Sequence, residues 1–322
     1  MPGTDPAEAA RVVAGELPDF PHLPELPARG PGADLTGRTA ALLVDMPAEV
    51  TPRGWRLAER PGRDVQRARS MLSADLDALE EALQGFSGPL KVQLCGPWTL
   101  AATLEQPRSM NPALADPGAV ADLAASLAEG AAAHVADVAK RVPGARLVVQ
   151  LDEPALPAVT AGSVPTASGL SRVAPAEEDT LRERLRAVLA ATTAYTVVHC
   201  CAEHVPFGII QEAGADALAV DLSLLRRGDT DELAGLAEAG RGLLAGAVDF
   251  AATERPGGPA PETAAARAAG ALWRRTGLAV AGRSEQVVIT PRCGLAGASP
   301  DQARQALRRC REAARILPEM TD

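Results

Sequence analysis

The sequence has few aromatic side chains, few lysines and no long apolar run. Its 322 residues include three Trp, one Tyr and four Phe, so aliphatic side chains must fill most of the core. Lys91 and Lys140 are the only lysines, and the net charge is −9. This charge disfavours nucleic acid and anionic membrane surfaces as partners. No run reaches the roughly 18 apolar residues that a membrane span requires.

The cysteines also exclude a class of protein. There are five of them, an odd number, and the N-terminal segment has no apolar signal region. A secreted, disulfide-stapled domain is therefore disfavoured. We expect a reduced, cytoplasmic protein in which Cys95 and Cys310 are ordinary buried thiols.

Short apolar runs recur along the chain after an N-terminal segment rich in Pro and Gly. We expect residues 1–38 to form an irregular arm, because each proline removes a backbone donor and fixes φ. The runs that follow are too short for helices and too continuous for one-sided strands, which is typical of parallel strands buried on both faces. They are residues 39–45, 91–97, 145–152, 195–201, 216–222, 242–250 and 286–294.

Helix-like stretches lie between these runs. They are residues 59–85, 117–141, 178–193, 204–213, 230–239, 262–281 and 299–316. Strands that alternate with helices indicate βαβ units and a parallel sheet. An open doubly wound sheet is the alternative, but no Gly-rich phosphate loop follows an early strand.

A (β/α)₈ barrel of the TIM type, formed by residues 1–322 as one domain, is the predicted fold. Seven strands are visible and a closed barrel has eight. We expect the first strand to be truncated or degenerate, near Met1–Thr4. The Gly- and Pro-rich segments 159–176 and 253–262 are predicted to be loops over the barrel mouth.

Residues that could bind a metal follow the predicted strands. Active sites of such barrels lie at the C-terminal ends of the strands. Those ends carry Asp152 and Glu153, then His199 and Cys201, and further along Asp221, Asp249 and Cys293.

Side-chain alternation along a strand selects among these residues. His199 and Cys201 must point to the same side, and Cys200 to the other. With Cys293, they provide one imidazole and two thiolates, a set that favours zinc. Asp221 or a water molecule would complete a tetrahedron. A site that keeps an exchangeable position is more typical of catalysis than of structural zinc.

The same segments resemble the catalytic domain of cobalamin-independent methionine synthase. The start, MPGTD, resembles the end of the family's first-strand motif, and residues 93–104 (QLCGPWTLAATL) its Gly-Pro-x-Thr segment. Residues 149–156 (VQLDEPAL) resemble its Asp-Glu-Pro-Ala motif and 197–201 (VVHCC) its His-x-Cys motif. Residues 289–295 (ITPRCGL) are similar to its Asn-Pro-Asp-Cys-Gly-Leu segment.

The resemblance implies a zinc-dependent methyltransferase of methionine biosynthesis. It implies zinc ligands at His199, Cys201 and Cys293, with Asp221 in the place of the family's glutamate. Asp152 would be catalytic and would hold the amino group of homocysteine. Glu153 and Trp98 would also contribute to the substrate site, and Asp249 would take part in catalysis. The methyl donor would be methyl-folate.

Three departures from the family pattern bear on the donor. We expect no second, N-terminal barrel to brace a folate polyglutamate, and we expect the family's carboxylate-binding serine to precede residue 1. Ala251 stands where the family has a histidine two residues after Asp249. Methylcobalamin or a corrinoid protein is therefore an alternative donor. Two alternative functions are a zinc methyltransferase acting with a corrinoid protein or another thiol, and a non-catalytic zinc- or thiol-binding barrel.

Overall fold

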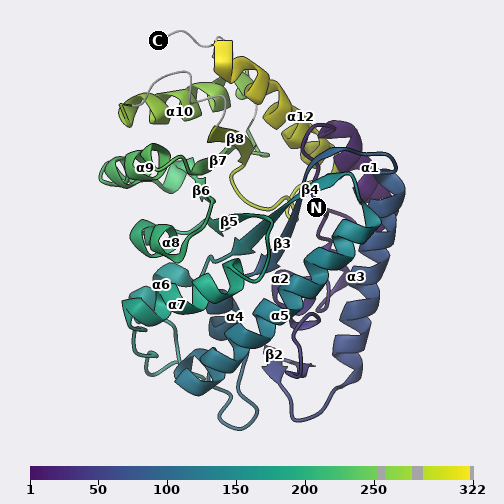
Figure 1. Cartoon of the computed structure of the whole chain (residues 1–322), viewed down its shortest axis with the longest axis vertical. Helices are drawn as coiled ribbons and strands as arrows, with labels where there is room; N and C mark the ends of the chain where they lie inside the picture. Colours follow the sequence, from purple (N-terminus) through teal and green to yellow (C-terminus); the bar gives the residue numbers. More distant parts are fainter. Residues whose placement is uncertain (253–257, 278–285, 320–322) are drawn as a thin grey trace.

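A curled sheet of six parallel strands forms the centre of the molecule (Figure 1). The computed structural model describes residues 1–252, 258–277 and 286–319. The strands pair in chain order, from β3 through to β8. They are β3 (Gly88–Cys95), β4 (Ala145–Asp152), β5 (Tyr195–Cys200), β6 (Ala217–Asp221), β7 (Gly242–Val248) and β8 (Val287–Pro291). Six of the seven predicted strands are thereby confirmed, as a half-barrel.

Both faces of the sheet are buried, as the continuous apolar runs require. On the concave face, five side chains form a small cluster. They are Val148, Val197, Ala217, Ala219 and Leu244. Phe20, from the N-terminal segment, packs against this cluster. The alternate side chains, such as Leu94, Leu151 and Val198, belong to the large core between the sheet and the helices.

Helices surround the outer face of the sheet (Figure 1). Those between or after the strands are α3 (Arg63–Ala82), α4 (Pro97–Thr103), α5 (Pro117–Arg141), α6 (Leu156–Thr160), α7 (Glu178–Leu189), α8 (Phe207–Ala213), α9 (Asp229–Glu238), α10 (Pro261–Arg275) and α12 (Pro300–Ile316). The Asp116 side chain accepts hydrogen bonds from two N–H groups at the start of α5. Ser299 and Gln302 form a capping box at the start of α12. All seven predicted helical stretches contain a helix, although residues 278–281 lie outside the described part.

The predicted strand at residues 39–45 is wrong. The segment contains the end of helix α2 (Leu35–Ala40) followed by a turn. Asp34 begins this helix, because its side chain accepts a hydrogen bond of 2.6 Å from the Gly37 N–H. Thr39 then contacts the sheet through its Oγ1, which accepts from the N–H of Cys95 at 2.8 Å. The apolar run is therefore buried against the sheet without being part of it.

The N-terminal segment is more regular than predicted. It contains α1 (Pro6–Glu16), which begins because Asp5 accepts hydrogen bonds from Ala7 and Glu8 and because proline suits the first helical position. A short 3₁₀ turn, η1 (Pro27–Arg29), follows. Met1–Thr4 form no strand. Instead, His22 makes an isolated parallel bridge with Lys91 at the free edge of β3.

Helix α1 joins the two ends of the helical ring. It packs against both α3 and α12. Glu8 pairs with Arg304, and Glu16 pairs with Arg308 at 3.1 Å. Contacts between the first and last outer helices therefore run through α1. The eight-stranded closure of a full (β/α)₈ barrel stays a prediction.

Other parts of the chain had no counterpart in the sequence-based prediction. Strands β1 (Ala48–Thr51) and β2 (Gly54–Leu57) form an antiparallel hairpin before α3. Short 3₁₀ turns occur at η2 (Ala113–Ala115), η3 (Leu222–Leu224) and η4 (Leu317–Glu319). The predicted loop at 159–176 begins at the end of α6, and residues 253–257 of the other predicted loop lie outside the described part.

Within the described ranges, no helix combines the length and the apolarity that crossing a membrane would need.

A substitution at Gly130 tests how closely α5 packs against the backbone of Leu42. A Cβ built there would lie 2.1 Å from the carbonyl oxygen of Leu42, a backbone atom that cannot easily move. We expect Gly130→Ala to lower the free energy of unfolding by roughly 1–3 kcal/mol, despite the better helix propensity of alanine. Gly15 in α1 is the matched control, because a Cβ there meets nothing within 4 Å. Gly15→Ala should be neutral or stabilising by up to about 1 kcal/mol. Urea denaturation of both variants distinguishes these outcomes.

Candidate metal and thiol site

Two cysteines from distant parts of the chain meet at the C-terminal edge of the sheet. Cys201 directly follows β5, and Cys293 lies two residues after β8. Their Sγ atoms are 3.5 Å apart. Two thiolates bound to one zinc ion in a tetrahedron, with Zn–S bonds of about 2.3 Å, would be roughly 3.8 Å apart. The dithiol therefore has the chemistry and the spacing to provide two ligands of such an ion.

His199 lies two residues before Cys201, and its ring is held by Asp152. The register of the sheet pairs Asp152 of β4 directly with His199 of β5. The Nδ1 atom of His199 is 2.7 Å from Oδ1 of Asp152, which also accepts a hydrogen bond of 2.7 Å from Gln150 Nε2. An ionised Asp152 requires the proton on Nδ1, which leaves the lone pair on Nε2. Histidines that bind metals are commonly oriented by a carboxylate in this way.

Cys200 is directed away from this edge, as the alternation predicts. It is fully buried in the core between the sheet and the helices, whereas Cys201 is partly exposed and Cys293 is exposed. The predicted register of β5 is confirmed by this difference. Cys95 and Cys310 are free and buried, also as predicted.

Asp221, the predicted fourth ligand, is directed elsewhere. Its Oδ1 accepts hydrogen bonds from the N–H and the Oγ of Ser223, at 2.8 and 2.6 Å, and so begins the η3 turn. Among the residues that the structure describes, no three His, Cys, Asp or Glu side chains are grouped closely enough to hold a metal ion. The predicted ligands are thus present as a dithiol and a His–Asp pair, with Asp221 engaged in a turn.

Glu153 and Trp98, also predicted at the substrate site, are buried. Glu153 is 0 % exposed, and its two carboxylate oxygens accept hydrogen bonds from the N–H groups of Trp98 and Thr99 at the start of α4. Burial raises the pKa of Glu153 to about 7 against the opposing effect of these hydrogen bonds. The Trp98 indole donates to the carbonyl of Leu181 at 3.1 Å. Both side chains fix the loop after β3, and their role in substrate binding stays a prediction.

An ion pair at the ends of the last two strands was missed by the sequence-based reasoning. Arg292 Nη1 is 3.1 Å from Oδ2 of Asp249, and the other oxygen of Asp249 accepts a hydrogen bond of 2.9 Å from the N–H of Ala251. Arg292 immediately precedes Cys293. Opposite charges at the ends of two consecutive strands were the available signal. Asp249, predicted to be catalytic, is thus the partner of an arginine.

The two thiols differ in acidity. The hydrogen bond with Cys201 is the largest of the effects that lower the pKa of Cys293 to about 6, and the electrostatic effect of His199 acts in the same direction. The same hydrogen bond, followed by burial, raises the pKa of Cys201. Loss of the first proton therefore belongs to the pair, which keeps one proton between its two sulfur atoms.

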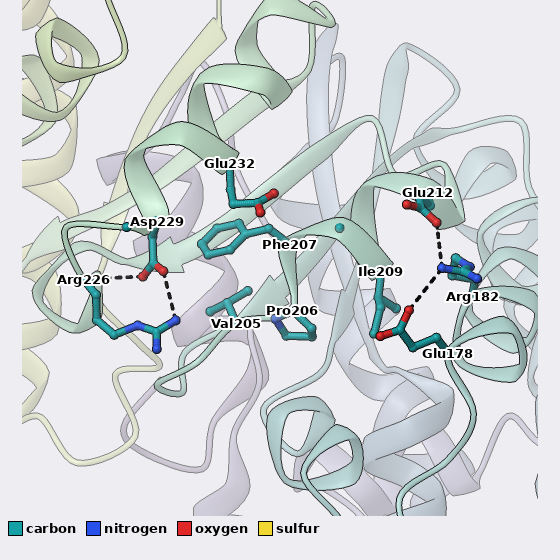
Figure 2. Close-up of a pocket in the computed structure, with 12 residues that line it drawn as sticks. Glu178, Arg182, Val205, Pro206, Phe207, Ile209, Glu212, Arg226, Asp229 and Glu232 are labelled. Atoms are coloured by element: carbon teal, nitrogen blue, oxygen red, sulfur yellow. Dashed lines mark hydrogen bonds and ion pairs between the residues drawn. The ribbon is translucent and has the colours of Figure 1, made fainter.

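A cavity lies apart from these residues, between α7, α8 and α9 (Figure 2). Its volume is about 630 Å³. Val205, Pro206, Phe207 and Ile209 lie along its centre, between the Arg226–Asp229 ion pair and the group of Arg182, Glu178 and Glu212 (Figure 2). None of the predicted site residues lines it.

The acidity of Cys293 gives a test on the metal-free protein. Alkylation by iodoacetamide follows the thiolate fraction, so we expect modification of Cys293 to be half-maximal near pH 6, with little reaction at pH 5. Cys201→Ala removes the hydrogen bond and should move this midpoint upward, toward the ordinary cysteine pKa of 9.0. Cys310 is the internal control, because burial raises its pKa to about 12. Peptide mass spectrometry measures each site, and an unchanged midpoint in Cys201→Ala would contradict the pairing.

Comparisons with known proteins place the chain in a family. Residues 111–316 match the family model described as the catalytic domain of cobalamin-independent synthase. No curated protein matches the chain. One solved structure that resembles it is a B12-independent methionine synthase from Shewanella sp. W3-18-1 in complex with selenomethionine. It has 15 % sequence identity and a TM-score of 0.49, and the match covers 76 % of this chain but only 66 % of that protein. The family match includes β4 to β8 and the four predicted ligands, and it shows that the chain belongs to the cobalamin-independent synthase family.

Proposed function

We propose that this protein transfers a methyl group to the sulfur of homocysteine, giving methionine, at a zinc ion held by His199, Cys201 and Cys293. The observation that carries the proposal is the convergence of the two cysteine Sγ atoms, 3.5 Å apart, beside a histidine whose Nδ1 is already bonded to Asp152. Asp221 or a water molecule would be the fourth ligand. Both bonds from Ser223 end on Oδ1 of Asp221, so its other oxygen would be the atom that binds the metal.

The chain's own groups prepare this site in three ways. Cys293 is ionised near neutral pH, so the first thiolate needs no added base. Asp152 fixes the tautomer and the direction of the His199 ring. A zinc ion held there would supply Lewis acidity that keeps a bound substrate thiol as a thiolate, and two cysteine thiolates would keep that sulfur electron-rich.

Asp152 is also the proposed contact for the amino group of homocysteine. Both of its hydrogen bonds, from His199 and Gln150, end on Oδ1. The second oxygen can therefore accept from a substrate ammonium group. In this arrangement one buried carboxylate orients both the metal ligand and the substrate, which places the reacting sulfur relative to its ligand.

The methyl donor is the least determined component. A methyl-folate is a poor leaving group unless its nitrogen is protonated, and general acid catalysis is typically worth about 10²–10⁴-fold. Ala251 offers no such acid, and Asp249 is paired with Arg292. We therefore propose methylcobalamin or a methylated corrinoid protein as a better donor than a folate polyglutamate. A chain that bound homocysteine without turnover would instead be a thiol-binding protein.

The setting of the proposed site is a single (β/α)₈ barrel domain in a reducing, cytoplasmic compartment. The six paired strands and the ring of outer helices support the barrel. The reducing compartment is supported by five cysteines that are all free, two of them close enough to oxidise.

Metal content tests the ligand set. We expect about one zinc per chain in the wild-type protein, and loss of most of it in Cys201→Ser and Cys293→Ser. Cys200→Ser is the matched control, because Cys200 faces the helices; it should keep its zinc although the buried hydroxyl costs some stability. Inductively coupled plasma mass spectrometry of the purified variants gives the stoichiometry. Equal loss in Cys200→Ser and Cys201→Ser would contradict the proposed site.

Single-turnover methyl transfer tests the reaction. Zinc-loaded protein is mixed with homocysteine and, in parallel, methylcobalamin, methyl-folate monoglutamate or methyl-folate triglutamate. We expect methionine to form fastest with methylcobalamin, because its leaving group needs no proton. The fastest reaction with the triglutamate would reverse the donor assignment and make the chain a folate-dependent synthase. Homocysteine binding without methionine from any donor would refute the catalytic proposal.

A further inference from the structure

Arg292 occupies a defined position at the edge of the sheet where Cys201 and Cys293 meet. Its backbone N–H donates to the carbonyl of Val248 at 3.0 Å. The backbone also packs closely on β7, because a Cβ built on Gly246 would lie 3.1 Å from the Cα of Arg292. The start of the Cys293 loop is therefore fixed against β7 by a hydrogen bond and by a close backbone approach.

Among the described residues, Asp249 is the one hydrogen-bonding partner of the Arg292 guanidinium group. Nη1 bonds to Asp249 at 3.1 Å, and this carboxylate is itself held by the N–H of Ala251. A guanidinium has five N–H donors in a planar fork, and this ion pair uses one of them. The Arg292 side chain is 42 % exposed. Ala251, which is also exposed, has no side chain beyond Cβ that could cover it.

The charges around the dithiol explain why a substrate would need this cation. The strand ends at this edge carry Asp152, Asp221 and Asp249, and the proposed ligand set adds two thiolates. An amino-acid thiol brings its own carboxylate into this negative region. Repulsion from these groups would weaken binding of the carboxylate form relative to a plain amine, unless a cation at this edge offsets it.

We infer that Arg292 is a specificity-determining residue that binds the carboxylate of the amino-acid substrate and product through the donors that Asp249 leaves free. This inference rests on the proposed function. Asp249 then acts as a positioning residue, because it aims the guanidinium at one place. Arginine suits this role better than lysine, since its fork can bind a carboxylate through two parallel hydrogen bonds.

The test compares two ligands that differ only in the carboxylate. Methionine and 3-(methylthio)propylamine share the thioether and the amino group, so contacts with the metal and with Asp152 contribute to both. Isothermal titration calorimetry of the zinc-loaded protein gives the two Kd values. We expect wild type to prefer methionine by about tenfold or more, and Arg292→Gln to reduce this preference to less than about threefold. The Kd for the amine should change little.

Two further variants keep the result interpretable. Arg315→Gln removes an exposed arginine from the last turn of α12 and should leave the preference unchanged. Arg292→Lys keeps a positive charge beside Asp249 and should therefore keep the conformation of the loop, but it lacks the planar fork of donors. It should reduce the preference for methionine over the amine by at least about threefold. If Arg292→Gln fails to fold or loses zinc, the ratio of the two Kd values of Arg292→Lys provides the test.

The outcomes separate this inference from the proposed function. A wild-type protein that binds both ligands equally, or variants of Arg292 that keep the full preference for methionine, would overturn the role of Arg292 and leave the proposed function standing. If the Arg292 variants bind both ligands more weakly by the same factor, Arg292 has only a structural role. This outcome also overturns the inference. Wild type that binds neither ligand would overturn the proposed function and the inference together.

Discussion

The hydrogen bond between Asp152 and His199 depends on the register of two parallel strands, and the candidate site depends on that bond. Pairing of β4 with β5 places these two residues side by side at the last position of the shared ladder. A shift of one residue would turn every side chain of β5 to the other face. His199 and Cys201 would then face the helices, and Cys200 alone would face the concave side of the sheet. The large apolar core behind Val198 and Cys200 fixes the register against this shift.

The same alternation explains what could be predicted from the sequence. A continuous apolar run flanked by turn residues indicates a strand buried on both faces, and six such runs are strands. The meeting of Cys201 and Cys293 followed from topology alone, because the C-terminal ends of parallel strands share one edge. Period-2 alternation separated Cys200 from Cys201 without any knowledge of the three-dimensional structure.

The features that could not be predicted depend on residues outside the short sequence segment in which each one lies. Residues 39–45 are apolar enough for a strand. However, the N-cap at Asp34, which lies outside this run, starts helix α2, and the helix includes the first two residues of the run. The high proline content of residues 1–38 obscured α1, whose start at Asp5 and Pro6 is nevertheless typical of a helix. The Asp152–His199 bond requires the register between β4 and β5. The Asp249–Arg292 pair requires the irregularity between Gly246 and Val248.

The two halves of the candidate site are fixed by different means. His199 and Cys201 are positioned by β5, whose backbone is hydrogen-bonded on both sides and whose rear face is buried. Cys293 lies in a loop, and what positions it is the residue before it. Arg292 holds the loop through Asp249, through the carbonyl of Val248 and through the close approach that Gly246 permits. An aspartate at this place, as in the segment that this sequence resembles, would face Asp249 as a like charge. The arginine therefore fixes the loop that carries Cys293, and the proposed contact with a substrate carboxylate would use the same guanidinium group.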